Sequence, residues 1–194
     1  FCNGWLRNWI KNNPLNTGPN WKCGQETAIR IFHVLTTAYL LEQYKNPTEA
    51  IKRFVFEHCK RIYPNIRYAI AQDNNHGISE AAALYIAGNW FIKFNLLKDR
   101  SSINKAQKWA DEGRYWLENR IDYLIMKDGS FSQYSMIYHR FVIDILCFVL
   151  LWKTILSLEL FSKDINHKIN KALVWIFEFT DTKTGNAPNI GAND

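Results

Sequence analysis

Apolar side chains recur along most of the chain at spacings of three and four residues, the period of an amphipathic α-helix. Two such stripes are Ala28, Phe32, Leu35 and Tyr39, and Phe141, Ile145, Phe148, Trp152 and Ile155. Val142, Leu146 and Val149 add to the second stripe, so that helix is apolar on most sides and is expected to be central. Because no segment alternates apolar and polar residues with the period of a strand, the sequence predicts an all-α fold.

Turn-forming residues divide this pattern into roughly seven helices joined by short loops. The interruptions are Asn12-Asn13-Pro14, Gly18-Pro19-Asn20, Asn46-Pro47-Thr48, Pro64, Asp73-Asn74-Asn75, Asp99–Ser102 and Lys127-Asp128-Gly129-Ser130. The last four helices are expected to run from about His76 to Phe94, from Asp99–Ser102 to Met126, from Ser132 to Phe161, and from Asp164 to Asp181. Short loops between long helices predict antiparallel helix hairpins.

The composition describes a folded chain that is rich in aromatic residues. Its 194 residues are 47% hydrophobic and 15% aromatic, which excludes general disorder and allows one domain or part of a larger one. The eight Trp, nine Tyr and twelve Phe are first of all core residues. Flat rings also cover the apolar faces of sugars, so the aromatic content is compatible with carbohydrate binding.

The net charge of +6 and the pI of about 9.1 favour an anionic partner. Nucleic acid is disfavoured, since the sequence has neither a run of five positive charges nor a basic helix interleaved with aromatic residues. The apolar segment from Phe141 to Trp152 has only twelve residues and contains Asp144, so no membrane span is predicted. An acidic polysaccharide remains compatible with the charge.

The cysteines and histidines do not form a recognisable metal or cofactor motif. Cys2, Cys23, Cys59 and Cys147 are widely separated and could form two disulfides in three ways, but buried free thiols are expected. The five histidines form no H-E-x-x-H motif, and no phosphate-binding glycine loop occurs. We therefore expect neither a metal nor a cofactor in this chain.

A first polar cluster comprises Gln72-Asp73-Asn74-Asn75-His76, with Glu80 one helical turn beyond His76. One explanation is helix capping, in which an Asp or Asn side chain binds free backbone N–H groups. Capping needs only one such side chain, whereas this segment has several in a row. Capping and a functional role both remain open for this cluster.

A second polar cluster runs from Asp128 to Ser135 and includes Gln133 and Tyr134. It is followed by Tyr138-His139-Arg140 at the start of the apolar helix. A turn followed by a packed tyrosine would explain part of this pattern. Three adjacent residues of this kind point in different directions on a helix, so packing alone is a poor explanation for all of them.

An amide cluster combined with a tyrosine suits β-elimination next to a uronate. Amide or imidazole donors can stabilise the charge that develops on the uronate, and a tyrosine can transfer the proton. Glycoside hydrolysis is the alternative, because pairs of carboxylates could be drawn from Asp73, Glu80, Asp128 and Asp144. Their spacing in the sequence does not establish that any two of them face each other.

Several motifs in the same order resemble the N-terminal part of heparinase II/III-type polysaccharide lyases. These motifs are Asn12-Asn13-Pro14, Gly18-Pro19-Asn20-Trp21, Glu26-Thr27-Ala28-Ile29-Arg30, Asn74-Asn75-His76 with Glu80-Ala81-Ala82, Asp128-Gly129-Ser130-Phe131 with Ser135 and Tyr138-His139, and Pro188–Asp194. Each motif is weak by itself, but the ordered set spans nearly the whole chain and is more specific.

The resemblance implies an incomplete (α/α) toroid over residues 1–183 and a linker over residues 184–194. The linker would lead to a C-terminal antiparallel β-sandwich domain that this chain lacks. Members of the family eliminate acidic glycans such as heparan sulfate or alginate, so the implied partners are an acidic polysaccharide and the protein's own β domain. The resemblance suggests a bacterial enzyme, and it leaves a periplasmic, secreted or cytoplasmic location open.

The resemblance also implies roles for individual residues. Asn75 would neutralise the uronate carboxylate beside His76, and Tyr138 would be the catalytic acid and also the base. The implied substrate-binding residues are Asn74, Glu80, Gln133, Tyr134, His139 and Arg140, together with Trp21 and Arg30, which could equally shape the toroid wall.

In this family the other catalytic histidine comes from the β domain. The resemblance therefore implies little or no lyase activity for these 194 residues alone. Two further interpretations stay open: a carbohydrate-binding or scaffold domain without catalysis, and an (α/α)-toroid glycoside hydrolase that uses carboxylates.

Overall fold

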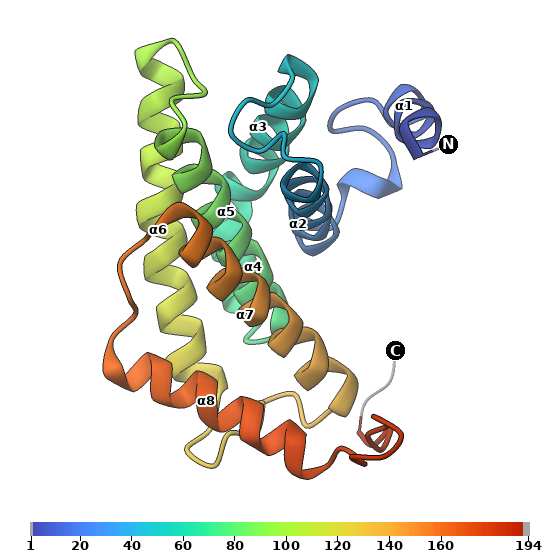
Figure 1. The fold of residues 1–194 in the computed structure, drawn as a ribbon, viewed down its shortest axis with the longest axis vertical. Coiled ribbons are helices and arrows are strands. Elements are labelled where there is room, and N and C mark those ends of the chain that lie inside the picture. The colour runs from blue at the N-terminus through green and yellow to red at the C-terminus, as the bar shows by residue number, and fades with distance from the viewer. Residues whose placement is uncertain (1, 192–194) are drawn as a thin grey trace.

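The computed structural model describes residues 2–191, with side chains from Gly4 onward. These residues form helices and connecting loops without a strand (Figure 1). The helices are α1 (Cys2–Asn12), α2 (Gly24–Leu40), α3 (Glu49–Ile62), α4 (Ile66–Ala71), α5 (Asn75–Lys93), α6 (Arg100–Leu124), α7 (Met136–Leu156) and α8 (Lys163–Glu178), with 3-10 turns η1 (Pro19–Trp21) and η2 (Tyr63–Asn65). The predicted all-α class is confirmed.

The helix boundaries differ most from the prediction around α7 and after Pro64, and by one to three residues elsewhere in the last four helices. The helix expected from Ser132 to Phe161 is shorter at both ends, because the Ser135 side chain caps its start and Ser157 ends it in the left-handed conformation, at φ 54°. The short helix α4 was not expected after Pro64. It forms because η2 carries the chain through the proline and helical hydrogen bonding resumes at Ile66.

Neighbouring helices form antiparallel hairpins. In α5 and α6, Gly88 faces Ala106 and Ala110, whereas Gly113 faces the earlier residue Tyr85, so the two helices run in opposite directions. The same holds for α7 and α8, since a ring nitrogen of His139 near the start of α7 lies 2.9 Å from the carbonyl oxygen of Ala172 late in α8. Near the end of α3, Arg61 donates to the carbonyl oxygen of Trp21, just before α2 begins.

Three helices, α2, α5 and α7, run in the same direction. Early in α5 the Glu80 carboxylate lies against Gly24, the first residue of α2, and later the Trp90 indole donates to the carbonyl oxygen of Tyr44, beyond the end of α2. The α7 ring of Phe148 packs on Phe32 of α2, with 4.7 Å between centroids. These three helices begin at the same end of the molecule, and their hairpin partners α3, α6 and α8 run the other way. This alternation is that of an incomplete (α/α) toroid.

The most completely buried helix is α5, whereas the sequence pattern favoured α7 for that position. Every residue from Gly77 to Gly88 is buried. Small residues such as Ala81, Ala82 and Ala83 let neighbouring helices approach α5 from several sides, so its burial exceeds what its side-chain hydrophobicity suggests. In α7, by contrast, Leu151 remains 43% exposed.

Replacing Gly113 with alanine is expected to destabilise the fold by about 3 kcal/mol. The added Cβ would lie 2.4 Å from the Tyr85 nitrogen, and neither helix can move without disturbing its other contacts. This clash outweighs the gain in helix propensity, roughly 1 kcal/mol. Thermal or urea unfolding measures the effect. Gly4→Ala is the matched control, since nothing lies within 4 Å of its added Cβ; equal stability of the two variants would contradict the proposed backbone contact.

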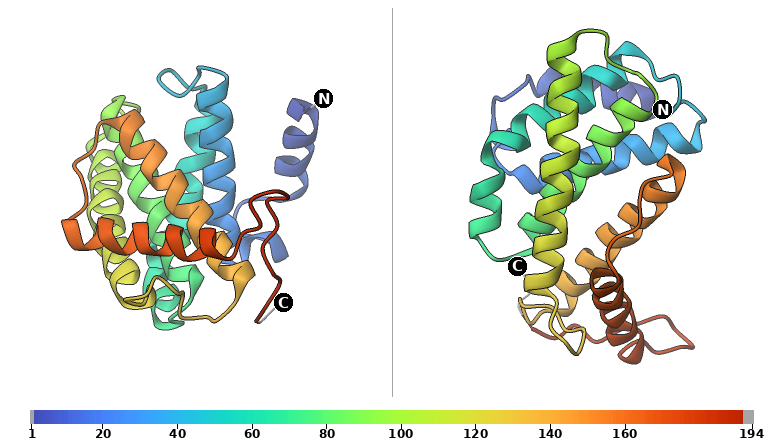
Figure 2. Two further views of the ribbon diagram at one scale, coloured as in Figure 1. Left: turned by 60° about the horizontal axis from the view of Figure 1, so that its bottom comes forward. Right: turned by 90° about the vertical axis from the view of Figure 1, so that its left-hand side faces the viewer.

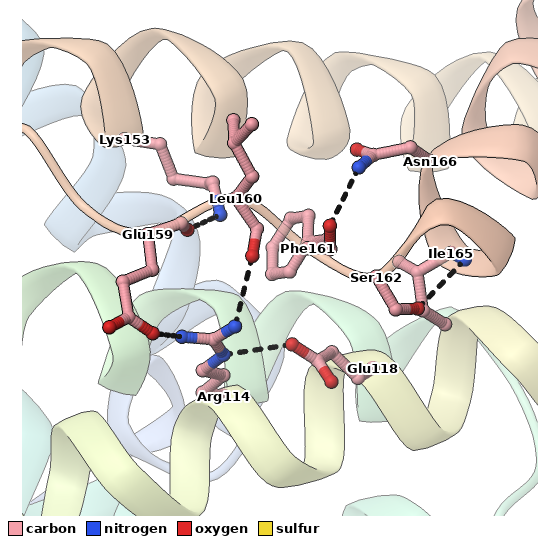
Figure 3. A network of polar contacts seen from close by, with 9 residues as sticks. All are labelled: Arg114, Glu118, Lys153, Glu159, Leu160, Phe161, Ser162, Ile165 and Asn166. Atoms are coloured by element: carbon pink, nitrogen blue, oxygen red, sulfur yellow. Dashed lines mark hydrogen bonds and ion pairs between the residues drawn. The ribbon is translucent and has the colours of Figure 1, made fainter.

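The connection between α7 and α8 is held by a polar network (Figure 3). Arg114 of α6 donates to Glu118, to Glu159 at 3.3 Å and to the carbonyl oxygen of Leu160 at 3.1 Å. Lys153 donates to the carbonyl oxygen of Glu159, and its amino nitrogen lies 3.5 Å from the centre of the Phe161 ring. Burial, assisted by the nearby positive charge of Arg114, lowers the pKa of Lys153 to about 8. The network fixes this connection against α6.

The described cysteines are free thiols, as expected, but they are not all buried. Only Cys59 is buried, while Cys23 is half-buried and Cys147 is exposed; the side chain of Cys2 lies outside the described residues. Burial raises the pKa of the Cys59 thiol. Within residues 2–191, no helix combines the length and the hydrophobicity that crossing a membrane requires.

Candidate functional site

The two polar clusters meet at the common starting end of α5 and α7. The side-chain oxygen of Gln133 accepts a hydrogen bond from the backbone N–H of Asn75 at 2.9 Å, across 58 residues of sequence. This contact uses one of the free N–H groups at the start of α5. The amide cluster and the loop that leads to Tyr138 therefore belong to one region of the structure.

Helix capping at the start of α5 is carried out by Asn74, which leaves Asn75 available. The Asn74 side-chain oxygen accepts from the backbone N–H of His76 at 2.9 Å. Asn75 is only 3% exposed, yet its carboxamide has no hydrogen-bond partner among residues 2–191. The side-chain atoms that are buried without a partner among residues 2–191 do not include those of Asn75, so its carboxamide reaches solvent, where a ligand can bind it.

His76 and Glu80 lie one helical turn apart on α5 and face each other. Nδ1 of His76 is 3.6 Å from Oε1 of Glu80, and their side chains are 25% and 3% exposed. The Glu80 carboxylate also lies so close to Gly24 that a Cβ at that position would come within 2.3 Å of it. The imidazole is accessible and the carboxylate is not, so this geometry favours Glu80 as the residue that holds His76.

An arginine that the sequence analysis missed supports the turn before α5. Arg120 of α6 is 8% exposed and forms an ion pair of 2.6 Å with Asp73, which has a positive φ of 49°. It also donates to the carbonyl oxygen of Ile70 at 3.3 Å. In the sequence, Arg120 could have been recognised as a charged residue next to Ile121, within the apolar stripe of α6. Arg120 positions the segment that carries Asn74 and Asn75.

Tyr138 is the third residue of α7 and is half-buried against the core. Its backbone N–H donates to the Ser135 hydroxyl at 3.3 Å, which fixes the first turn of the helix. Tyr134 lies in the preceding loop, is 80% exposed and has a positive φ of 50°. Both tyrosines follow Gln133 closely in the chain, Tyr134 in the loop and Tyr138 in the first turn of α7.

His139 and Arg140 make contacts away from the amide cluster. His139 is 2% exposed, points toward α8 and stacks on Trp175 with 4.6 Å between the ring centroids. Burial lowers its pKa. It borders a cavity of about 240 Å³ lined by Ser130, Phe131, Tyr134, Ser135, Met136, His139, Trp175, Phe179 and Ile190.

The C-terminal segment that follows α8 runs past the start of α7 (Figure 2, left). Arg140 donates to the carbonyl oxygen of Pro188 at 3.5 Å. The backbone N–H of Met136 donates to the carbonyl oxygen of Ile190 at 3.0 Å. Gly191 lies so close to the backbone of Tyr134 that an added Cβ would be 2.0 Å from the Tyr134 carbonyl oxygen. The part of the predicted linker up to residue 191 therefore runs beside the candidate site. Residues 192–194 of that prediction lie outside the described residues.

Trp21 and Arg30 form a separate cluster of interior contacts. The Arg30 guanidinium lies 5.1 Å from the ring centre of Trp9 and 5.4 Å from that of Trp21. It donates to the Asn20 carbonyl oxygen, to Thr27 and to Nε2 of His58. Burial lowers its pKa. Since the chain itself uses these donors, the geometry favours the alternative in which Trp21 and Arg30 shape the toroid wall.

His58 is expected to make the fold sensitive to acid. It is fully buried, its Nδ1 lies 2.7 Å from the Phe54 carbonyl oxygen, and its Nε2 accepts from Arg30, so the ring is held neutral. Burial is the main cause that lowers its pKa to about 4 from 6.5. As the pH falls, the His58 imidazole of the unfolded chain takes up a proton before that of the folded chain does. The contribution of His58 to the free energy of unfolding is therefore complete above pH 6.5 and is lost towards pH 4, on the order of 3 kcal/mol.

Urea unfolding at a series of pH values measures this loss. His58→Leu should have a flatter stability profile between pH 6.5 and 4 than the parent protein, whatever its absolute stability. His33→Gln removes an exposed histidine and serves as the control. A His58→Leu profile parallel to that of the parent protein would show that this imidazole is not held neutral.

The electrostatics of the site favour an anion. Because α5 and α7 begin at one end, the partial positive charges of two helix N-termini meet there, while the N-terminus of α2 already faces the Glu80 carboxylate. His76 adds a half-buried imidazole, and Asn75 adds a carboxamide that has no hydrogen-bond partner in the described part of the chain. Within residues 2–191, no three His, Cys, Asp or Glu side chains are grouped so that they could hold a metal ion.

Comparisons with known proteins agree with this architecture. Residues 4–189 match the family described as Heparinase II/III N-terminus. A heparin-sulfate lyase from Bacteroides thetaiotaomicron is 29% identical over 151 residues, which cover 72% of this chain and 20% of that protein. The chain thus spans about a fifth of the length of this curated relative. No solved structure matches the chain. The match over almost its entire length shows that the chain belongs to the heparinase II/III family, to whose N-terminal helical part it corresponds.

Proposed function

We propose that the protein cleaves an acidic, uronate-containing polysaccharide by β-elimination. The observation that carries this proposal is the Asn75 carboxamide, which has no hydrogen-bond partner among residues 2–191 and lies at the start of α5 beside the loop leading to Tyr138. Membership of the family and the similarity to a protein named heparin-sulfate lyase support the same chemistry. Heparan sulfate and related uronate polymers are the substrate class that we propose.

In the proposed mechanism, the Asn75 side-chain N–H donates to the uronate carboxylate, with His76 beside it. This hydrogen bonding stabilises the negative charge that develops when the C5 proton leaves. Tyr138 takes that proton as its phenolate and then returns a proton to the glycosidic oxygen. The C4–O bond breaks, a C4=C5 double bond forms on the uronate, and no water is consumed.

The carboxylates that glycoside hydrolysis would need have other partners or are exposed. Asp73 is paired with Arg120, and Glu80 is buried against His76. Asp128 accepts hydrogen bonds from Ser130, which lower its pKa, and Asp144 is exposed on α7. These contacts favour elimination over the hydrolytic alternative.

The proposed activity can be tested by screening the full-length protein against uronate polymers: heparan sulfate, chondroitin sulfate, hyaluronan, alginate and polygalacturonate. We expect ultraviolet absorbance from the new double bond to increase with at least one of them. Binding of these polymers without any increase in absorbance would instead support a carbohydrate-binding domain without catalysis.

A further inference from the structure

A second cavity lies between α1, η1 and α3, on elements that do not carry the amide cluster. Its volume is about 460 Å³, within the range of small-ligand sites. Its lining is largely aromatic and aliphatic with three polar side chains: Trp9, Ile10, Asn13, Pro14, Leu15, Trp21, Ala50, Arg53, Phe54 and Glu57. A mostly apolar lining with a few polar groups is typical of pockets that bind small organic ligands.

The aromatic rings of Trp9 and Phe54 in this cavity are held in place by neighbouring side chains. Trp9 and Phe54 lie 6.4 Å apart between centroids, inclined at 60°. The Arg30 guanidinium lies against Trp9, and Phe54 stacks on His58 at 3.9 Å. Both rings therefore have fixed orientations before any ligand arrives, which reduces the entropy lost on binding.

The polar groups that remain available in this cavity are donors. Arg53 is exposed, and its guanidinium has no ion-pair or hydrogen-bond partner among residues 2–191. The Trp9 indole N–H has none there either.

The other two polar side chains of the lining are already engaged. Glu57 is paired with Lys60 at 2.9 Å. The Asn13 amide donates to the Trp9 carbonyl oxygen, and its oxygen accepts from Asn20. The available groups thus call for a ligand that is anionic, rich in acceptors and flat enough to lie on a ring.

We propose that this cavity binds one acidic sugar unit, with its ring against Trp9 and Phe54. Its carboxylate or sulfate lies on Arg53, because a guanidinium binds such groups with charge-assisted, bidentate hydrogen bonds. That the unit belongs to the polysaccharide being cleaved rests on the proposed function. A second attachment point apart from the amide cluster keeps a long polymer near the site after one end dissociates.

The proposal can be tested by titrating a heparan sulfate hexasaccharide into the full-length protein by calorimetry, in an Asn75→Ala background that slows turnover. We expect Arg53→Ala to raise the dissociation constant about tenfold, which corresponds to the loss of one charge-assisted contact. Trp9→Phe keeps a ring against Arg30 but removes the indole N–H, and it should raise the constant by a smaller factor. Arg100→Ala removes an exposed arginine at the start of α6 as a matched control and should leave it unchanged.

Four results would overturn the proposal. One is an unchanged dissociation constant in Arg53→Ala. Another is equal weakening by Arg53→Ala and Arg100→Ala, which would indicate general attraction between charges. The third is equally tight binding of neutral maltohexaose, which would indicate an uncharged sugar. The fourth is a Trp9→Phe variant that changes only the oligomeric state, which would indicate a protein partner.

The proposed function and this cavity can fail independently. If the parent protein forms unsaturated ends but its binding does not depend on Arg53, the proposed elimination stands and the proposed sugar site in the cavity is wrong. Binding that depends on Arg53, in a protein that cleaves none of the polymers, would do the reverse.

Discussion

Tyr138→Phe is expected to lower the turnover number of the full-length protein on its polysaccharide by on the order of 10³-fold. The substitution removes only the hydroxyl that would carry the proton from C5 to the glycosidic oxygen. The ring still packs against the core, and the backbone N–H of residue 138 still donates to Ser135. Binding and thermal stability should therefore change little, and steady-state kinetics with a parallel binding titration measure both quantities.

An exposed tyrosine on a helix that carries neither polar cluster gives the control for this substitution. Tyr115 lies on α6 and is 61% exposed, so Tyr115→Phe should behave as the parent protein does. If Tyr138→Phe retained turnover within a few-fold while substitution of Asp73 or Glu80 abolished it, a carboxylate mechanism would replace the one proposed here.

Asn75→Ala is expected to lower turnover by about 10²–10³-fold, the usual cost of removing one donor to a developing negative charge. The carboxamide has no partner within residues 2–191, so its loss breaks no internal hydrogen bond. The contact from the Asn75 backbone N–H to Gln133 does not depend on the side chain and persists. The effect should thus appear in the turnover number, with the melting temperature nearly unchanged.

Two further variants make the role of Asn75 specific. Asn75→Asp has almost the same shape but places a negative charge beside the uronate carboxylate, so it should be at least as inactive as the alanine variant. Asn104→Ala removes an exposed asparagine from α6 and should have no effect. Full turnover in Asn75→Asp would show that this side chain does not meet the carboxylate.

The hydrophobic pattern predicted the helical class and the hairpins because the apolar stripes repeat over many residues. It misjudged which helix is central. Burial of α5 depends on small residues such as Ala82 and Gly88, which score low in hydrophobicity but allow close backbone contact. The ends of α7 were also missed, since a serine cap and one left-handed serine decide them locally.

The two clusters of the candidate site could be recognised in the sequence as interruptions of the helical pattern, but their contact could not. It depends on a hydrogen bond between Gln133 and Asn75, which the parallel packing of α5 and α7 brings together. The sequence also could not show that Asn74 caps α5 whereas the Asn75 carboxamide has no partner among residues 2–191, because both depend on the three-dimensional geometry. Arg120 was missed because its ion pair with Asp73 joins residues far apart in the chain.

Elimination and hydrolysis can be distinguished directly by digesting the preferred uronate polymer in water enriched in ¹⁸O and measuring the heavy oxygen in the products. Elimination breaks the C4–O bond without consuming water, so the account predicts products with an unsaturated uronate end and no heavy oxygen incorporated by cleavage. Mass spectrometry of freshly released oligosaccharides, with a correction for exchange at the reducing end, gives the answer. Products that gain one heavy oxygen per cleavage and lack the double bond would contradict the account.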